Sequence, residues 1–258
     1  MRARRAVPDD IGAIAALTRA NRACLAGWSP VWWRQRPGAD DLHAAWLGHL
    51  VSAEGPVARV VEEGGEVVAC AVAVPQPGQW FVDDVSVADP AAWPALLAAV
   101  EERPALTCAA AEDRDRAAAC RDAGLTWMSS LWIGPAGPAG PPEGTVEPLG
   151  GSESLPAPPP HTFAGLAPAL VLGDGAGGVV AGSPSLPAPP IYDPGGTVAV
   201  VDRLTGADRA RLLAHARAAI AARGDVLVAV VAAAGDAGLA DVLGGAGLTR
   251  TVDVYAWP

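Results

Sequence analysis

The sequence predicts an α+β protein, with a three-layer α/β arrangement in which a mixed, mainly antiparallel sheet is flanked by helices, present as two tandem pseudo-repeats. The first observation is an internal repeat, because residues 57–70 align without gaps with residues 169–182 at an offset of 112. The second is that apolar runs, turns and helical patterns follow the same order in both halves of the chain. The third is size: 258 residues with 51% apolar content can bury two small cores or one shared core.

Two further matches extend the repeat. Residues 81–89 match residues 200–208 at an offset of 119, and residues 123–126 match residues 246–249 at an offset of 123. The offset therefore grows by 7 and then by 4, which are loop-sized insertions. A unit of roughly 80 to 90 residues has been duplicated, and two units are too few for a solenoid. The natural interpretation is a pseudo-two-fold pair of domains.

The first copy is predicted to begin with a strand and two helices. Residues 2–6 form the strand, and Asp9 or Asp10 caps a helix that extends to Cys24. The second helix has an apolar face at amphipathic spacing, made of Leu42, Ala45, Trp46, His49 and Leu50. This placement puts His43 on the solvated face of the same helix.

A sheet with two more helices follows. The hairpin of strands 57–62 and 67–74 turns at Gly64-Gly65, and its second strand is apolar on both faces, which is typical of a strand inside a sheet. The other elements of the first copy are strand 80–87, a helix from Asp89-Pro90 to Val100, strand 105–109, helix 113–122 and strand 125–133. The second copy repeats this order as strands 169–172, 179–182 and 198–204, helix 209–223, strand 226–231, helix 237–244 and strand 249–256.

A proline-rich segment separates the two copies. Residues 135–162 contain nine prolines and several glycines, a composition that cannot hold a regular element. The predicted organisation is an N-terminal domain of residues 1–135, a linker of residues 136–162 and a C-terminal domain of residues 163–258.

Charge and composition exclude several classes of function. The net charge is −10 and all 18 basic residues are Arg, but the charges form no basic field, which argues against a nucleic-acid partner. No apolar run is long enough to span a membrane, and the N-terminus has no apolar signal core, so we expect a cytoplasmic protein without a membrane partner. The four cysteines show no Cys-x-x-Cys spacing and are expected to be buried free thiols, and no metal site is predicted.

The order of elements resembles that of the GNAT superfamily of N-acetyltransferases. Residues 81–94 and Tyr192-Asp-Pro-Gly-Gly196 resemble segments of an actinobacterial GNAT group. The Ala-Gly-Leu-Thr sequence before the last strand of each copy resembles the Tyr-x-x-x-Gly-Phe ending of the family. The resemblance implies two GNAT-like domains, of which the second is degenerate and lacks counterparts of the two N-terminal helices.

The coenzyme A loop of the family is altered in both copies. In the family, an Arg/Gln-x-x-Gly-x-Gly/Ala turn presents free amides at a helix start to the pyrophosphate. The first copy has Asp89, which would repel phosphate, and Pro90 and Pro94, which lack an N–H donor. The second copy is the better candidate for binding acetyl-CoA or another acyl-CoA, although Asp208 also fits an N-cap there. The residues that this resemblance implies are Thr205, Gly206, Arg209 and Arg211.

Three residues are implied as catalytic. Asp83 and Asp202 occupy the same position in the two copies, where family members often place a general base. The alternative is a structural Asp satisfied by a bulged backbone or by Arg. Asp84 ranks lower, because it alternates to the other face of the strand. Tyr255 on the last strand corresponds to a general acid of the family, which favours the second copy as the catalytic one.

Four tryptophans mark a candidate acceptor site. They lie in the region where the family binds its acceptor, on or near the aromatic and basic connection of residues 27–37, and aromatic walls suit an apolar or aromatic amine. The residues are Trp28, Trp32, Trp33 and Trp46. The alternative is that these rings fill the seam between the domains.

Together these features predict an acyl-CoA-dependent N-acyltransferase, with acetyl as the expected acyl group and a small-molecule amine as the acceptor. The direct attack of an amine on a thioester would use Asp83 or Asp202 as base and backbone amides of the splayed strand to polarise the carbonyl. The alternatives are a non-catalytic GNAT-derived binding module that has lost the coenzyme A phosphate loop and a purely structural interaction protein. The chain is expected to be a monomer with pseudo-two-fold domains or a homodimer.

Overall fold

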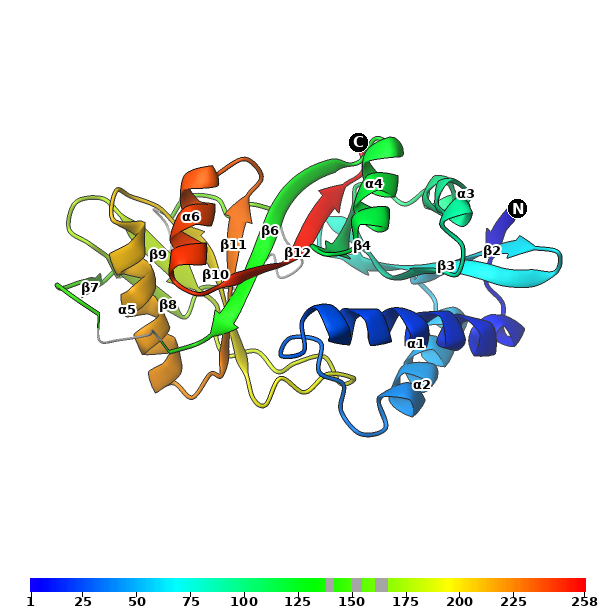
Figure 1. Cartoon of the computed structure of the whole chain (residues 1–258), viewed down its shortest axis with the longest axis horizontal. Helices are drawn as coiled ribbons and strands as arrows, with labels where there is room; N and C mark the ends of the chain where they lie inside the picture. Colours follow the sequence, from blue (N-terminus) through cyan, green and yellow to red (C-terminus); the bar gives the residue numbers. More distant parts are fainter. Residues whose placement is uncertain (138–141, 150–154, 161–166) are drawn as a thin grey trace. The chain divides into compact units, whose positions relative to one another are not determined.

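The chain forms two compact units (Figure 1). The structure is a computed structural model, and it describes residues 1–137, 142–149, 155–160 and 167–258. Unit 1 consists of residues 1–127, 190–193 and 254–258, and unit 2 consists of residues 128–189 and 194–253. Both units are therefore made of discontinuous segments, whereas the sequence led us to expect contiguous domains. Parts of the expected linker, residues 138–141, 150–154 and 161–162, lie outside the described residues.

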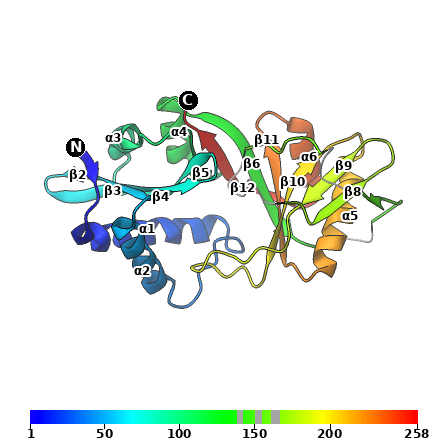
Figure 2. The same cartoon turned by 180° about the vertical axis from the view of Figure 1, so that it is seen from behind.

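Unit 1 has three layers. Its strands are β1 (Arg2–Arg5), β2 (Val57–Glu63), β3 (Glu66–Gln76), β4 (Gln79–Val87) and β5 (Ala105–Ala110), joined at the edge by the end of β12 (Thr249–Ala256). Its helices are α1 (Ile11–Trp28), α2 (Ala39–Ser52), α3 (Trp93–Ala99) and α4 (Arg114–Asp122). Helices α1 and α2 lie on one face of the sheet and α3 and α4 on the other (Figures 1 and 2). Neighbouring strands are antiparallel except β4 and β5, which are parallel. This arrangement confirms the predicted α+β class.

The central strand β3 explains why the sheet is covered on both sides. Cys70 and Val72 belong to the core beneath α1 and α2, together with Ile14, whereas Ala69 and Ala71 belong to the core beneath α3 and α4. All four strand residues are almost fully buried. The prediction of an interior strand that is apolar on both faces is confirmed.

Unit 2 repeats the second part of this plan. Its strands are β6 (Thr126–Pro135), β7 (Glu147–Pro148), β8 (Leu170–Gly173), β9 (Val179–Gly182), β10 (Val198–Leu204) and β11 (Leu227–Ala233), with the first part of β12 beside β6. Helices α5 (Arg209–Ala222) and α6 (Ala237–Gly245) cover one face of this sheet (Figures 1 and 2). Leu212 and Leu243 of these helices share one core with Val201 and Val230 of the sheet.

The last strands of the two copies are exchanged. β6 is the last strand of the first copy but pairs with β11 of unit 2, and Leu131 lies opposite Val231. β12 is the last strand of the second copy, but its end lies beside β5 of unit 1, where the amide of Trp257 donates to the carbonyl of Ala105 at 3.1 Å. Both copies end in similar apolar strands, so either strand fits either sheet, which is the condition for an exchange of equivalent elements.

Two local predictions are wrong. Asp10 lies at the N-cap position of α1, but its side chain does not cap the helix, because its carboxylate accepts hydrogen bonds from Arg4 at 2.7 and 2.8 Å and from the amide of Val7 at 2.8 Å. The hydrogen bond from Arg4 lowers the pKa of Asp10. The segment expected to lack regular structure contains β7, a two-residue edge strand that pairs with β8. Pro148 is tolerated there because an edge strand leaves N–H positions unpaired.

Candidate functional site

Strand β4 contains a bulge at Asp83 and Asp84. Before the bulge Asp83 lies opposite Val72 of β3, and after it Ser86 lies opposite Cys70, so the register shifts by one residue. Asp84 has a φ of 50°, in the left-handed region that Asp tolerates better than most residues. The amide of Asp84 donates a hydrogen bond to Oδ1 of Asp83 at 2.8 Å. One irregularity of the strand therefore holds two adjacent carboxylates.

His43 of α2 contacts Asp84 from the interior of unit 1. Its Nε2 lies 3.0 Å from both carboxylate oxygens of Asp84, and its Nδ1 lies 2.6 Å from Nη1 of Arg22 on α1. A guanidinium can only donate, so Nδ1 accepts and Nε2 carries the hydrogen that is donated to Asp84. Both His43 and Arg22 are buried. A chain of hydrogen bonds thus connects α1 through α2 to the bulge of β4.

The burial of His43 corrects the predicted orientation of α2. The residues of α2 that face the core are Ala39, His43, Leu47 and Leu50. Leu42 and Trp46, predicted to lie on the apolar face, are 44% and 50% exposed. Hydropathy alone missed the correct face because His43 is a polar residue whose two ring nitrogens are satisfied inside the protein. The i, i+4, i+8 spacing of Ala39, His43 and Leu47 was the signal that could have revealed it.

Residues 190–193 complete unit 1 beside the connection between α1 and α2. Gln35 and Tyr192 form an antiparallel β-bridge, and the amide of Asp193 donates to the carbonyl of Arg34 at 2.8 Å. The amide of Arg36 donates to the carbonyl of Ile191 at 3.2 Å. These bonds fix Tyr192 against a connection that the sequence predicted to line a site.

The aromatic rings of this region gather around Trp33. Its ring centroid lies 5.2 Å from that of Tyr192 and 5.9 Å from that of Trp32, both in edge-to-face geometry. Trp28 and Trp46 lie at exposed positions instead, and Trp46 stacks near His49 on the outer face of α2. The structure therefore brings together two of the four predicted tryptophans. It adds Tyr192, which could not be predicted to join them because it is distant from them in the sequence.

Asp83 has the electrostatic character of a base. Asp83 is an exposed residue, and no Arg or His among the described residues forms an ion pair with it. Desolvation by the surrounding protein and the charge of Asp84 raise the pKa of Asp83 to about 6, although Arg116 and His43 act in the opposite direction. Burial and the same two carboxylates raise the pKa of Tyr192. A carboxyl group that titrates near neutrality and remains accessible suits proton abstraction.

Asp202, the equivalent residue of unit 2, lies in a different environment. Its Oδ1 is 3.0 Å from Nη1 of Arg203, so an ion pair neutralises the carboxylate. Of the two residues predicted as bases, Asp83 is the one without a cationic partner in the part of the chain that the structure describes. The assignment of either residue as the base stays a prediction.

Strands β4 and β5 separate next to this site. Their pairing ends at Val82 and Thr107. Arg116 of α4 is buried beyond this point and donates to the carbonyl of Val85 at 3.3 Å and to Oγ1 of Thr107 at 3.0 Å. At the corresponding position of unit 2, the apolar Leu239 belongs to the core. In unit 1 a guanidinium of the protein therefore bonds to the strands where they diverge.

The helix start that follows β4 does not fit a coenzyme A pyrophosphate. Oδ1 of Asp89 accepts the amide of Ala91 at 2.9 Å, and Pro90 begins a short 3₁₀ turn before α3. A carboxylate already occupies the place where a phosphate would bind the free amides, and Pro90 and Pro94 have no N–H to offer. The interpretation of this turn from the sequence agrees with its geometry.

The helix start of unit 2 also carries a carboxylate. Oδ1 of Asp208 accepts the amide of Arg211 at 3.1 Å, and Oδ2 lies 3.4 Å from Nε of the same residue. Arg209 pairs with Asp236 at 2.7 Å. Thr205 bonds to Val179 through the backbone, and a Cβ on Gly206 would lie 2.5 Å from the Cα of Gly178. Both arginines are engaged by carboxylates, so this start does not fit a pyrophosphate either, and binding of acyl-CoA by these four residues stays a prediction.

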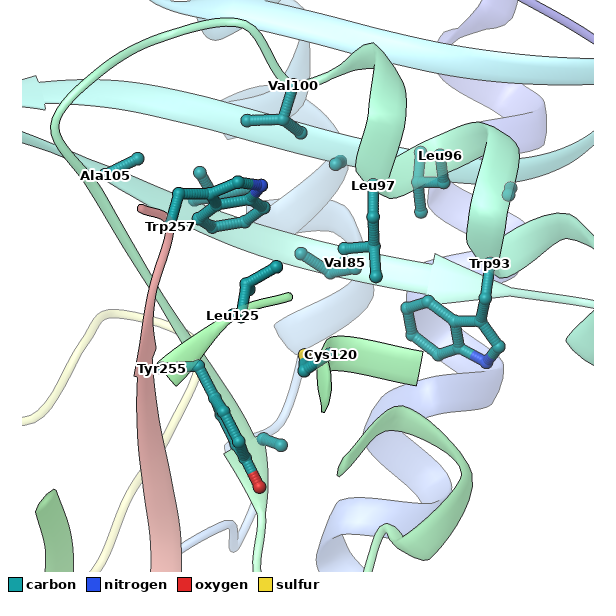
Figure 3. Close-up of a cluster of buried hydrophobic side chains, with 14 of the residues drawn as sticks. Val85, Trp93, Leu96, Leu97, Val100, Ala105, Cys120, Leu125, Tyr255 and Trp257 are labelled. Atoms are coloured by element: carbon teal, nitrogen blue, oxygen red, sulfur yellow. The ribbon is translucent and has the colours of Figure 1, made fainter. Parts of the chain in front are cut away.

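Tyr255 lies in the core of unit 1. The strand exchange carries it there, and Figure 3 shows its ring with Leu125, Cys120 and Trp257 in the core under α3 and α4. It is 2% exposed. In the sequence this residue belongs to the second copy, where it favoured that copy as the catalytic one. Because Tyr255 lies in unit 1, it no longer favours unit 2 as the catalytic unit.

A cavity of about 560 Å³ lies between α3 and α4, is lined by Trp93, Leu97 and Trp257 among others, and contains none of the predicted site residues. Cys70 and Cys120 are buried free thiols as expected, whereas Cys24 is exposed. Among the described residues, no group of three or more His, Cys, Asp or Glu side chains could hold a metal ion. No helix in that part of the chain is both long and apolar enough to cross a membrane.

Comparisons with known proteins bear on the fold. No family model matches the sequence, and no curated protein matches it. A protein from Thermoplasma acidophilum that is assigned as an acetyltransferase is similar over 100% of this chain and 99% of its own, with 11% identity and a TM-score of 0.54. A tandem GNAT protein from the clavulanic acid biosynthesis pathway covers 100% and 99% at 13% identity, with a TM-score of 0.40. A GCN5-related N-acetyltransferase from Sphaerobacter thermophilus covers 99% and 94% at 15% identity, with a TM-score of 0.49.

At these identities the likeness concerns the fold alone. The fold comparison rests on the Thermoplasma acidophilum protein, whose TM-score is the highest of the three. Unit 1 has the element order that the sequence predicted from its resemblance, from β1 through α1, α2 and the meander of β2, β3 and β4 to β5 and α4. This order and the likeness over the whole chain show that the protein has the fold of the GNAT acetyltransferases.

Proposed function

We propose that the protein is an N-acyltransferase that acts on a small organic amine, and that the amine binds in unit 1 at Asp83. The observation that carries this proposal is the bulge of β4, where the exposed residue Asp83 has a carboxyl group with a pKa raised to about 6 and no ion-pair partner among the described residues. A substrate ammonium would supply the missing positive charge. Asp202 is less suited to this role, because Arg203 already neutralises it.

The aromatic rings support an amine with an apolar or aromatic body. Trp32, Trp33 and Tyr192 form a cluster in unit 1, and the charges of Asp83 and Asp84 act on the hydroxyl of Tyr192. Aromatic faces attract a cationic nitrogen, and neighbouring carboxylates strengthen that attraction. An arylalkylamine such as phenylethylamine combines both features and serves as the probe in the experiments below.

In this proposal Asp83 removes a proton from the bound ammonium, directly or through one water molecule. The amine nitrogen then has a free electron pair for attack on an acyl group. The amide of Asp84 holds the Asp83 carboxylate in place during this transfer. Acetyl-CoA is proposed as the acyl donor on the resemblance to the family, and since neither helix start fits its pyrophosphate, no residue of the chain is assigned to it.

A non-catalytic amine-binding module is the second candidate. The carboxylates of Asp89 and Asp208 at the two helix starts and the guanidinium of Arg116 between β4 and β5 favour it. Each of these groups belongs to the protein and occupies a place that an acyl-CoA would need. Such a module would retain the amine site of unit 1 and lack transfer.

Release of free thiol from acetyl-CoA in the presence of phenylethylamine separates the two candidates. Thiol release that requires both the amine and Asp83 would support the acyltransferase. Saturable amine binding by calorimetry without thiol release would support the binding module. If the amine neither binds nor is acylated, the assignment of unit 1 as an amine site is wrong.

Replacement of Trp33 by Ala is expected to weaken amine binding by about fivefold, because one aromatic contact to a cation contributes on the order of 1 kcal/mol. Trp46→Ala is the matched control, since Trp46 is exposed and lies on the outer face of α2. Calorimetric titration of both variants measures the difference. Equal affinities for the two variants would contradict the placement of the amine against Trp33. Equal affinities together with a larger loss of melting temperature in Trp33→Ala would assign Trp33 a packing role only.

A further inference from the structure

We infer that Arg22, His43 and Asp84 form a buried relay that fixes the bulge of β4 and thereby positions Asp83. The catalytic meaning of this relay rests on the proposed function, but its structural meaning does not. Arg22 and His43 are positioning residues in this inference, because they act on Asp83 through Asp84 and do not reach the reacting atoms.

The relay consists of direct hydrogen bonds between three elements. Nη1 of Arg22 donates to Nδ1 of His43 at 2.6 Å, and Nε2 of His43 donates to the carboxylate of Asp84 at 3.0 Å. At its other end Arg22 donates to Asp40 at 2.5 Å, and Asp40 also pairs with Arg19 at 2.8 Å. The series therefore runs from a partly exposed ion pair on α1 and α2 to the interior of the sheet.

The backbone of Asp84 explains why an anchor is needed. A non-glycine residue with a φ of 50° is held in a conformation that costs free energy unless its surroundings fix it. His43 binds the side chain of Asp84, and Sγ of Cys70 lies 3.5 Å from its carbonyl oxygen. The amide of the same residue donates to Oδ1 of Asp83. A shift of Asp84 would therefore displace the carboxylate of Asp83 directly.

The titratable groups that face Asp83 come from four directions. Asp84 is on the same strand, Arg116 approaches from α4, His43 from α2, and Tyr192 from residues 190–193. Only Asp84 both bonds to the Asp83 carboxylate and is itself held by a buried side chain among the described residues. The relay therefore acts on Asp83 through direct hydrogen bonds, whereas the other groups act on it only electrostatically.

Two pairs of variants test the relay in the full chain. His43→Gln retains a side chain that can donate to Asp84, whereas His43→Leu does not. Asp84→Asn keeps an acceptor for His43 and tolerates the left-handed backbone, whereas Asp84→Gly keeps the backbone and removes the anchor. Asp84→Gly guards against a His43→Leu protein that fails to fold. The measurements are hydrogen exchange of the amide of residue 84, the carboxyl NMR titration of Asp83, and the affinity for phenylethylamine.

We expect the exchange of the residue 84 amide to accelerate by about tenfold in His43→Leu and Asp84→Gly, because one buried hydrogen bond is lost in each, and to change little in the two conservative variants. The Asp83 titration should move to lower pH in Asp84→Asn, because a neighbouring negative charge is removed. Wild-type exchange of this amide in both His43→Leu and Asp84→Gly would overturn the relay. If exchange and titration respond as expected but no variant or wild type binds the amine, the relay stands and the proposed function fails.

Discussion

Replacement of Asp83 by Asn is expected to lower kcat/KM for amine acylation by about 10² to 10⁴, the usual contribution of a positioned general base. Asn has nearly the same shape, and the residue it replaces is accessible to solvent, so the fold should be retained. The amide of Asp84 can still donate to the side-chain oxygen of Asn. Initial rates of thiol release, measured beside a thermal melt of the same protein, separate a loss of chemistry from a loss of structure.

The same assignment predicts how the activity changes with pH. The pKa of Asp83 is raised to about 6, and the base acts only when it is deprotonated, so wild-type activity should fall as the pH drops through about 6. Asp83→Asn should lack this acid limb. Asp202→Asn, the equivalent change in unit 2, is the control and should keep both the rate and the limb. An Asp83→Asn protein with wild-type rates and an unchanged profile would remove Asp83 from the mechanism.

Replacement of Tyr255 by Ala is expected to destabilise unit 1, although this residue belongs to the last strand of the second copy in the sequence. Its ring is buried with Leu125 and Cys120, and the loss of a buried aromatic side chain costs about 3 to 5 kcal/mol. Hydrogen exchange resolved along the chain should show the increase in residues 57–125. Segments of α5 and β11 should be much less affected.

Trp132→Ala is the reciprocal change for the exchanged strand β6. Trp132 belongs to the last strand of the first copy but packs against the core of unit 2, with Leu212 and Val230. Its replacement should loosen residues 198–248 more than residues 57–125. If Tyr255→Ala loosens unit 2 and Trp132→Ala loosens unit 1, the last strands are not exchanged.

The elements of the fold could be predicted because local patterns determine them. The apolar run of β3 is long and uninterrupted, and most predicted strands and helices begin and end within one or two residues of their observed bounds. The resemblance to the GNAT superfamily also predicted a second copy without counterparts of the two N-terminal helices. The exchange of the last strands could not be predicted, because β6 and β12 have equivalent patterns and pairing partners are chosen by contacts distant in the sequence.

The candidate site was predicted only in part. Asp83, Trp32 and Trp33 were singled out from the sequence, and the structure places them all in unit 1. His43 was assigned to solvent, because no hydropathy pattern shows that Arg22 and Asp84 satisfy both of its nitrogens. The ion pairs of Arg209 and Arg211 could not be predicted from the sequence either. They depend on how the helix start is capped and on where Asp236 lies in the fold.

Calorimetric titration of phenylethylamine at neutral pH into the wild type, Asp83→Asn and Asp202→Asn tests the central claim most directly. That claim is that unit 1 binds an amine at Asp83. We predict one binding event in the wild type, a loss of affinity of about tenfold or more in Asp83→Asn because an ion pair with the ammonium is removed, and wild-type binding in Asp202→Asn. Wild-type affinity in Asp83→Asn together with weakened binding in Asp202→Asn would contradict the claim and move the amine site to unit 2.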